Sequence, residues 1–294
     1  MSFPVYINSS NWVSGGNFKV SLPNSVDLSP FDVSVDQMFV YYSWYNISAA
    51  LGNNQFQIKI PTKSSTITST ITLPDGAYNI STLNNYLQYW FLTNGYYAQN
   101  NSTGVYTYYG AFALSPQSYA VQWITTALPT SPATGYTYGS GWTTTINGDN
   151  LPTSSNQSIQ LVVFSTNTFN QIIGFAAGTY PSSATISGTT YTAQSTLVPN
   201  VNPIYSVQCR LSCCYGRLSA NSQLLHTFTN GSNSIGQLID ASPRFWQPVS
   251  CVGTHSELTF SMFDQNGNPL QLIDPNITVK LSFRRRDTNI NIHS

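Results

Sequence analysis

Short runs in which apolar and polar side chains alternate recur along the 294 residues of the chain. Clear cases are residues 18–22, 55–60, 66–73 and 277–283. Such alternation is typical of a β-strand that turns one face to a core and the other to solvent or to a partner. About nine or ten strands of this kind, separated by Gly, Pro, Asn and Asp turns, predict an all-β protein built as an antiparallel β-sandwich.

Charged residues are scarce, and this excludes several classes of protein. They make up 7% of the chain, ten basic against ten acidic, where ordinary soluble proteins carry about 25%. A basic nucleic-acid binder is excluded by the zero net charge, and a charged disordered chain by the 14% aromatic content. No apolar run reaches the roughly 18 residues that a membrane span needs. We therefore expect a surface that is partly covered by partners.

One helix is predicted, because Ile80, Leu83, Leu87, Trp90 and Phe91 recur at spacings of three and four residues. The residue before it, Asn79, or else Ser81, can cap its start, and an Asn-Gly pair at residues 94–95 can end it. Residues 168–175 look like a short helical turn that ends at Gly174.

Five motifs, taken in their order along the chain, carry a resemblance to a known family. They are residues 75–78 (Asp-Gly-Ala-Tyr), 172–175 (Ile-Ile-Gly-Phe), 225–228 (Leu-His-Thr-Phe), 243–249 (Pro-Arg-Phe-Trp-Gln-Pro-Val) and 258–270, which includes Asp-Gln-Asn-Gly and is followed by the strand pattern of residues 277–284. This order resembles the penton (minor capsid) proteins of virophages, polinton-like viruses and their giant-virus relatives. The resemblance covers about half of the chain and is strongest from Val201 onward. It implies a single jelly roll that forms homopentamers at the five-fold vertices of an icosahedral virion.

The resemblance also implies a set of partners, and a shift in composition along the chain predicts a domain organisation. Residues 77–209 contain no Lys, Arg or Glu, and their only acidic residue is Asp149. We expect residues 1–97 to form the N-terminal part of the jelly roll, residues 98–158 a β-rich insertion, and residues 159–294 the C-terminal part. The expected partners are further copies of the chain, a double jelly-roll major capsid protein, other minor capsid proteins and, through the insertion, a host receptor. The expected location is the virion, assembled inside the infected host cell.

No catalytic, cofactor-binding or metal-binding residue is predicted, and we expect the protein not to be an enzyme. Asp75, Asp149, Asp264 and Asp274 stand in turn contexts, where Asp bonds to its own backbone, and nothing in the sequence pairs them for catalysis. A Gly-x-Ser-x-Gly nucleophile turn is also missing.

Four cysteines lie late in the chain, at Cys209, Cys213, Cys214 and Cys251, and three interpretations of them remain open. The favoured one is buried structural thiols, because a strand would turn Cys209 and Cys213 to one core face, and no secretion signal is visible. A zinc site could be drawn with His255, which is four residues beyond Cys251. A disulfide could join Cys209 or Cys214 to Cys251. The other histidines are His226 and His293.

Two further clusters have a structural and a functional interpretation. Arg284, Arg285 and Arg286 are either a solvated strand end or a contact with capsid neighbours or nucleic acid, which three arginines would bind weakly. The tyrosines of residues 96–138 supply packing and interface, or they stack on sugars. Two alternatives to the capsid function follow from the composition: a receptor-binding spike or fibre head, and a carbohydrate-binding β-sandwich module. A fibre usually shows a repetitive shaft, and none is visible.

Overall fold

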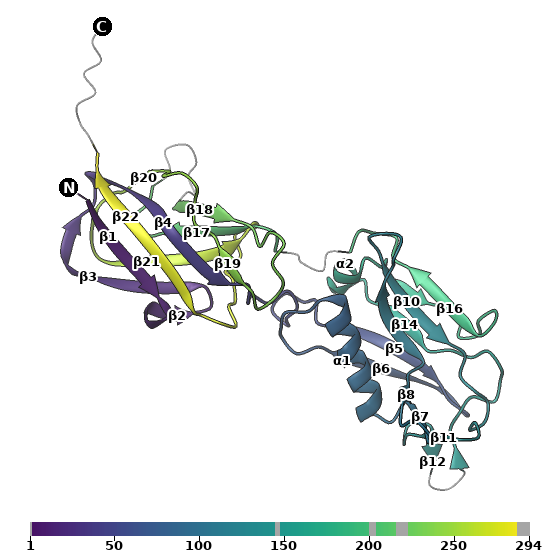
Figure 1. Ribbon diagram of the computed structural model, residues 1–294. Helices are drawn as coiled ribbons and strands as arrows, with labels where there is room; N and C mark the ends of the chain where they lie inside the picture. Colours follow the sequence, from purple (N-terminus) through teal and green to yellow (C-terminus); the bar gives the residue numbers. More distant parts are fainter. Residues whose placement is uncertain (1, 145–147, 200–203, 216–222, 287–294) are drawn as a thin grey trace. The chain divides into compact units, whose positions relative to one another are not determined.

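The computed structural model describes residues 2–144, 148–199, 204–215 and 223–286, which fall into two compact units. The jelly-roll unit consists of Met1–Tyr45 and Ile204–Ser294, and the inserted unit consists of Asn46–Pro203. Each unit has its own hydrophobic core. The chain therefore leaves the first unit once, builds the second, and returns to finish the first (Figure 1).

Two antiparallel sheets form the jelly-roll unit. The first has the order β1 (Ser2–Asn8), β22 (Ile277–Arg285), β4 (Phe31–Tyr41) and β19 (Leu238–Asp240), and β20 (Val249–Ser250) also pairs with β4. The second has the order β18 (Leu224–Phe228), β17 (Val207–Leu211), β21 (Thr254–Asp264), β3 (Asn17–Asp27) and β2 (Trp12–Ser14). A short 3-10 helix, η1 (Ser9–Asn11), joins β1 to β2.

The strand order is that of a jelly roll. If β2 and β20 are set aside, the eight strands in chain order are β1, β3, β4, β17, β18, β19, β21 and β22. The first sheet takes the first, eighth, third and sixth of them, and the second sheet takes the second, seventh, fourth and fifth. This arrangement is the eight-stranded double Greek key. The predicted antiparallel jelly-roll β-sandwich is confirmed.

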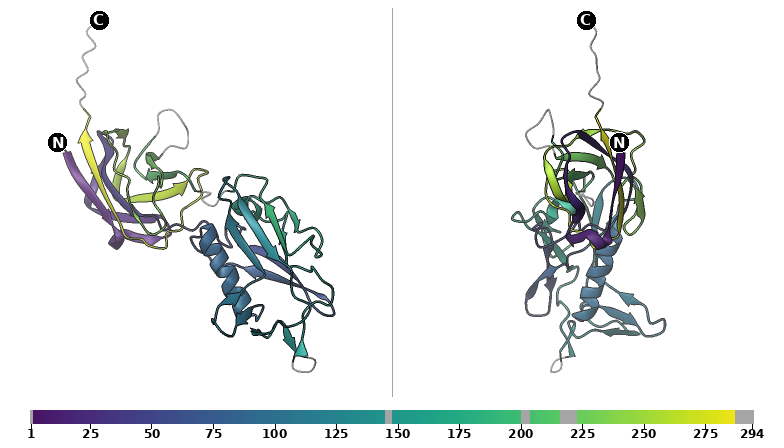
Figure 2. Two further views of the ribbon diagram at one scale, coloured as in Figure 1. Left: turned by 45° about the vertical axis from the view of Figure 1, so that its right-hand side comes forward. Right: turned by 90° about the vertical axis from the view of Figure 1, so that its left-hand side faces the viewer.

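The last strand shows how the sequence makes this sandwich. Ile277, Val279, Leu281 and Phe283 alternate with polar residues, and all four are at most 4% exposed. Because β22 pairs with β1 on one side and with β4 on the other, it lies inside the first sheet. Figure 2 shows β1 and β22, from the two ends of the chain, side by side.

The inserted unit contains four small sheets and both α-helices of the described residues. The largest sheet has the order β15 (Gly178–Tyr180), β14 (Gln160–Val163), β5 (Gln55–Pro61) and β6 (Thr66–Thr72). The second has the order β16 (Thr190–Gln194), β10 (Val121–Thr126) and β9 (Gly110–Leu114). The others are β11 (Tyr136–Tyr138), β7 (Ala98–Asn100) and β8 (Tyr106–Thr107), and β12 (Thr143–Thr144) with β13 (Gly148–Asp149).

The predicted helix is α1 (Ile80–Thr93), and its ends are where the sequence places them. The Asn79 side chain accepts a hydrogen bond from the Thr82 backbone, and the Thr82 hydroxyl accepts one from the Asn79 backbone, each at 2.8 Å. Four apolar side chains of the helix are buried, at Ile80, Leu83, Leu87 and Phe91. The second helix, α2 (Phe169–Ile173), is the predicted short turn, and Gly174 ends it with a φ of 72°. No helix of the described residues is long and apolar enough to cross a membrane.

The division of the chain differs from the expected one, in which residues 98–158 were the insertion. The inserted unit is larger and begins at Asn46. β5 and β6 alternate as regularly as the jelly-roll strands, but Ile58 of β5 faces Leu161 of β14, and both side chains are buried in the core of the inserted unit. Period-two alternation identifies a strand but does not indicate which hydrophobic core the strand belongs to. For this reason the observed inserted unit, Asn46–Pro203, is larger than the expected insertion.

Candidate interaction surfaces

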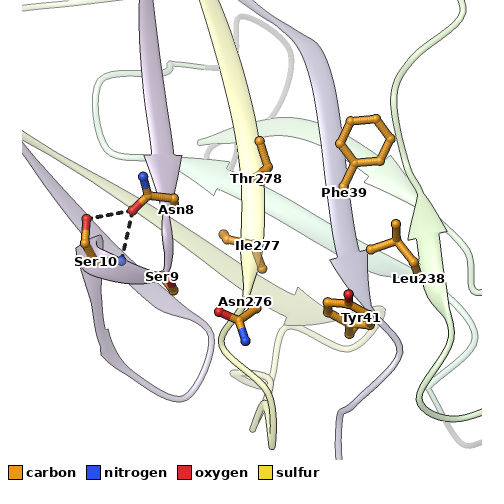
Figure 3. Close-up of a pocket in the computed structure, with 9 residues that line it drawn as sticks. All are labelled: Asn8, Ser9, Ser10, Phe39, Tyr41, Leu238, Asn276, Ile277 and Thr278. Atoms are coloured by element: carbon orange, nitrogen blue, oxygen red, sulfur yellow. Dashed lines mark hydrogen bonds between the residues drawn. The ribbon is translucent and has the colours of Figure 1, made fainter.

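The outer face of the first sheet of the jelly-roll unit carries a hollow of about 580 Å³. It is lined by Asn8, Ser9, Ser10, Phe39, Tyr41, Leu238, Asn276, Ile277 and Thr278. Figure 3 shows Asn8 to Ser10 on one side, Phe39, Tyr41 and Leu238 on the other, and β22 between them. The Asn8 side-chain oxygen accepts hydrogen bonds from the Ser10 backbone at 2.9 Å and from its hydroxyl at 2.6 Å. The hollow therefore has an uncharged lining with a fixed polar rim.

Two charged side chains on the same face, Asp36 and Lys280, are paired with each other. Asp36 accepts a hydrogen bond from the Ser282 hydroxyl at 2.6 Å and lies 3.2 Å from the Lys280 ammonium group. The hydrogen bond from Ser282 is the main cause that lowers the pKa of Asp36, and Lys280 contributes in the same direction. Arg284 lies over the Trp246 ring, 4.5 Å from its centroid. Asp36 and Lys280 therefore neutralise each other, whereas Arg284 keeps its positive charge against the neutral Trp246 ring.

The three arginines at the end of β22 have different surroundings. Arg284 is on Trp246, whereas Arg286 lies 3.2 Å from the Asp32 carboxylate and donates a hydrogen bond to the Cys251 carbonyl at 3.1 Å. Arg286 therefore ties the end of β22 to the start of β4 and to the segment between β20 and β21. Two of the three arginines are engaged inside the chain, which favours the structural interpretation of this cluster over a phosphate-binding one.

All four cysteines are buried and none forms a disulfide. The Cys209 sulfur lies 3.8 Å from the Met38 sulfur, and the Cys213 sulfur lies 3.7 Å from that of Cys251. Cys214 is paired with Cys251 across an isolated antiparallel bridge. Hydrogen bonds, first with Cys214 and then with Cys251, lower the pKa of the Cys213 thiol.

The zinc interpretation lacks a ligand set in the described part of the chain. His255 points its Nε2 to the Val252 carbonyl at 2.8 Å, and no group of three or more His, Cys, Asp or Glu residues in the described ranges is arranged to hold a metal ion. His226 bonds to the Ala241 carbonyl at 2.8 Å, and burial lowers its pKa. His293 lies outside the described residues.

The four aspartates predicted in turns each form a hydrogen bond or an ion pair within the chain. Asp264 accepts hydrogen bonds from the backbones of Asn266 and Asn268, both at 2.8 Å, and Asp274 accepts one from Asn276 at 2.9 Å. These two confirm the predicted turn role. Asp75 accepts a hydrogen bond from the Ala49 backbone at 2.8 Å, and Asp149 lies 3.9 Å from the Lys63 ammonium group.

A second hollow, of about 330 Å³, lies in the inserted unit. Its lining is uncharged and includes three tyrosines, and it consists of Thr107, Tyr109, Ala127, Pro129, Ala133, Tyr136 and Tyr138. Burial, followed by the neighbouring Tyr138, raises the pKa of Tyr109 far above the ordinary tyrosine value. Tyr96 packs edge-on against the buried Trp142, as the packing interpretation expects, and of the three tyrosines in the hollow Tyr109 and Tyr138 are buried whereas Tyr136 is 38% exposed.

Several apolar side chains of the jelly-roll unit are exposed, and the sequence patterns described above do not predict them. Tyr6 is 57% exposed, Leu238 is 50% exposed, and Phe245 is 75% exposed. A signal for Tyr6 was present, because it alternates with the buried Val5 and Ile7 and must face outward. Phe245 lies outside any strand, so no periodicity could indicate its exposure.

Comparison with known proteins gives matches among solved structures and none among protein families or curated sequences. No family model matches the chain, and no curated protein sequence matches it. Among solved structures, the crystal structure of the mavirus penton protein is similar over 97% of this chain and 98% of that chain. The two share 11% sequence identity, and the TM-score is 0.41. Identity and score at this level do not assign the chain to a family.

Proposed function

We propose that the chain is a structural capsid protein, the penton, which forms homopentamers at the five-fold vertices of an icosahedral virion. The observation that carries the proposal is the strand order of the jelly-roll unit, an eight-stranded double Greek key closed by β1 and β22 from the two ends of the chain. The order of the five sequence motifs supports the same conclusion independently. Three of the five, residues 225–228, 243–249 and 258–270, fall in the jelly-roll unit.

The surface of the jelly-roll unit suits burial against other subunits. The outer face of the first sheet combines exposed Tyr6 and Leu238 with an uncharged hollow, and two of its charges, Asp36 and Lys280, are paired with each other. Such a face loses water at less cost than a face of unpaired Lys and Glu. We expect the hollow of Figure 3 to form part of the contact between neighbouring subunits.

A closed ring needs two different patches on each subunit, because a cyclic contact of more than two copies is heterologous. A specific contact of this kind buries at least about 1,000 Å² in total. The number five rests on the motif resemblance, and the proposed neighbours of the ring are major and minor capsid proteins. The protein is proposed to act by assembly rather than by catalysis, in the virion, and to be assembled inside the infected host cell.

The inserted unit has a function of its own in this proposal, separate from the assembly of the ring. It has its own core and an uncharged hollow with three tyrosines, which suits contact with a host receptor. The same hollow is the observation that favours the alternative of a carbohydrate-binding module, because tyrosine rings stack on sugar rings. A receptor-binding fibre head is the remaining alternative.

The test is the mass of the purified 294-residue chain in native mass spectrometry. The expected species has five times the 32.3 kDa mass of one chain. The variant Leu238→Asp should shift the pentamer toward monomer, while the matched control Tyr119→Asp, on a 74% exposed residue of the inserted unit, should not. A stable trimer would favour the fibre head, and a stable monomer that binds sugars would favour the carbohydrate module; either result contradicts the penton.

A further inference from the structure

Three of the four cysteines meet at one point in the core of the jelly-roll unit. Cys213 and Cys214 follow the end of β17, and Cys251 lies between β20 and β21. The Cys213 and Cys251 sulfurs are 3.7 Å apart, and Cys214 faces Cys251 across an isolated bridge. Cys209 is separate, with its sulfur 3.8 Å from the Met38 sulfur.

Backbone hydrogen bonds hold the two segments together on both sides of the thiols. The Val252 amide donates to the Cys213 carbonyl at 2.9 Å, and the Tyr215 amide donates to the Ser250 carbonyl at 3.2 Å. These two bonds flank the pair of Cys214 and Cys251, which is therefore the closely spaced, non-hydrogen-bonded type of antiparallel pair. A disulfide requires its sulfurs at about 2.05 Å, so Cys213 and Cys251 need to approach by only about 1.7 Å.

We propose that Cys213 and Cys251 are an oxidation site, at which a peroxide converts the two thiols into a reversible disulfide. The Cys213 thiolate attacks one peroxide oxygen, the O–O bond breaks, and the released hydroxide takes up a proton to leave as water. The Cys251 sulfur then attacks the sulfur of the resulting Cys213 sulfenic acid. The S–S bond forms as the S–O bond breaks, and the Cys251 proton leaves with the hydroxide as a second water. Two thiols are oxidised and one peroxide is reduced.

The burial of the two thiols favours a small oxidant over a large one. Cys213 and Cys251 are both 0% exposed, so a bulky disulfide such as oxidised glutathione reaches them only when the core opens. Hydrogen peroxide is about the size of two water molecules and needs a much smaller opening. Among the three neighbouring thiols Cys213 is the nucleophile, because hydrogen bonds from its two neighbours favour its thiolate form.

The disulfide would also change the stability of the jelly-roll unit. It would join two residues 38 positions apart and would close a loop that contains β18, β19 and β20. A cross-link of this length restricts the unfolded chain, which should raise the melting temperature by about 5–10 °C. Reduction with dithiothreitol should reverse the shift.

The experiment treats the folded full-length chain with hydrogen peroxide, quenches it, and counts free thiols after unfolding. The count should fall from four to two. Peptide mass spectrometry without reduction should then find the peptide that contains Cys213 joined to the peptide that contains Cys251, lighter than the sum of the two by two hydrogen atoms. The variants Cys213→Ser and Cys251→Ser should lose this link, and the matched control Cys209→Ser, at the separate cysteine, should keep it.

Three results would overturn the proposal. One is a count of four thiols after peroxide treatment of the folded chain. The others are a link from Cys214 to Cys251, and a link that persists in Cys213→Ser. If Cys213→Ser does not fold, fragmentation of the linked peptide from the unmodified chain still assigns the partner of Cys251. Oxidised glutathione should not produce the link in the folded chain, and equal rates with both oxidants would contradict the buried site.

Discussion

Phe283 shows how single side chains join the two ends of the chain. It is 0% exposed, and its ring stacks on that of Phe3 with centroids 4.9 Å apart. Phe283→Ala should lower the free energy of unfolding of the jelly-roll unit by about 3–5 kcal/mol, because it removes a buried ring and leaves a cavity. Chemical denaturation is the measurement. Tyr6→Ala, on the outer face of the same sheet, is the control, and an equal loss in both variants would contradict the assignment of the core face.

Asp36 makes the stability of the jelly-roll unit depend on pH in a definite direction. Its pKa is lowered in the folded chain, mainly by the hydrogen bond from Ser282, so the unfolded chain takes up its proton first as the pH falls. The stabilisation is present above the unfolded pKa, near 3.8, and is lost as the pH falls through the lower folded pKa.

The variant Asp36→Asn tests this residue. The difference in unfolding free energy between the unmodified chain and this variant should shrink between neutral pH and about pH 3. The size of the effect is modest, because the Asp36 side chain is 25% exposed. A difference that stays constant over this range would show that Asp36 has the same pKa in both states.

Cys213 illustrates which residue positions the sequence could not predict. The alternation in 209–213 put Cys209 and Cys213 on one core face, and both are indeed buried. The strand ends at Leu211, however, and a turn follows, so the period no longer determines the direction of Cys213. Its approach to Cys251 depends on pairing between segments 38 residues apart, which no local pattern contains.

At the scale of the element, β22 is the best-predicted strand and has the largest structural role. It is paired over its whole length with β4 and along Ser2–Asn8 with β1. Truncation after Asp274 removes the strand and exposes the paired edges of β1 and β4, so we expect insoluble protein without a cooperative unfolding transition. Truncation after Arg286 keeps every described strand and is the control. Recovery of a soluble, cooperatively folded product from the shorter chain would contradict the internal position of β22.

The start of α1 gives a separate prediction at the same scale. Asn79→Ala removes the side-chain acceptor for the Thr82 amide, and the free energy of unfolding of the inserted unit should fall by about 1 kcal/mol. Asn85→Ala, on an exposed position of the same helix, is the matched control. The two variants are compared by chemical denaturation, and equal stability would show that solvent satisfies the amide equally well. The helix was predictable because its apolar spacing, its cap and its end are all local features.

At the scale of the whole molecule, the sequence predicts where strands lie but does not predict which sheet each strand joins. The runs at 55–60 and 66–73 were identified as strands, and the structure has β5 and β6 there. β5 pairs with β6 and also with β14, which lies about a hundred residues further along the chain. The sheet to which β5 and β6 belong therefore depends on long-range pairing. The resemblance, strongest from Val201 onward, implied the jelly roll, whereas the shift in composition put the expected start of the insertion at residue 98 and the inserted unit begins at Asn46.

The two separate cores lead to a prediction for the whole molecule. Replacing Asn46–Pro203 with a Gly/Ser linker removes only side chains of the inserted unit and leaves the complete core of the jelly-roll unit. This variant should unfold cooperatively in thermal or chemical denaturation. Replacing residues 98–152 alone should have a different result, because it deletes β9 and β10 with Phe112, Val121 and Trp123 from the core of the inserted unit while β5, β6 and α1 remain. That variant should keep the jelly-roll transition but bind hydrophobic dyes through the exposed remainder. Loss of all cooperative unfolding in the first variant, or a native-like inserted unit in the second, would show that the two units do not fold independently.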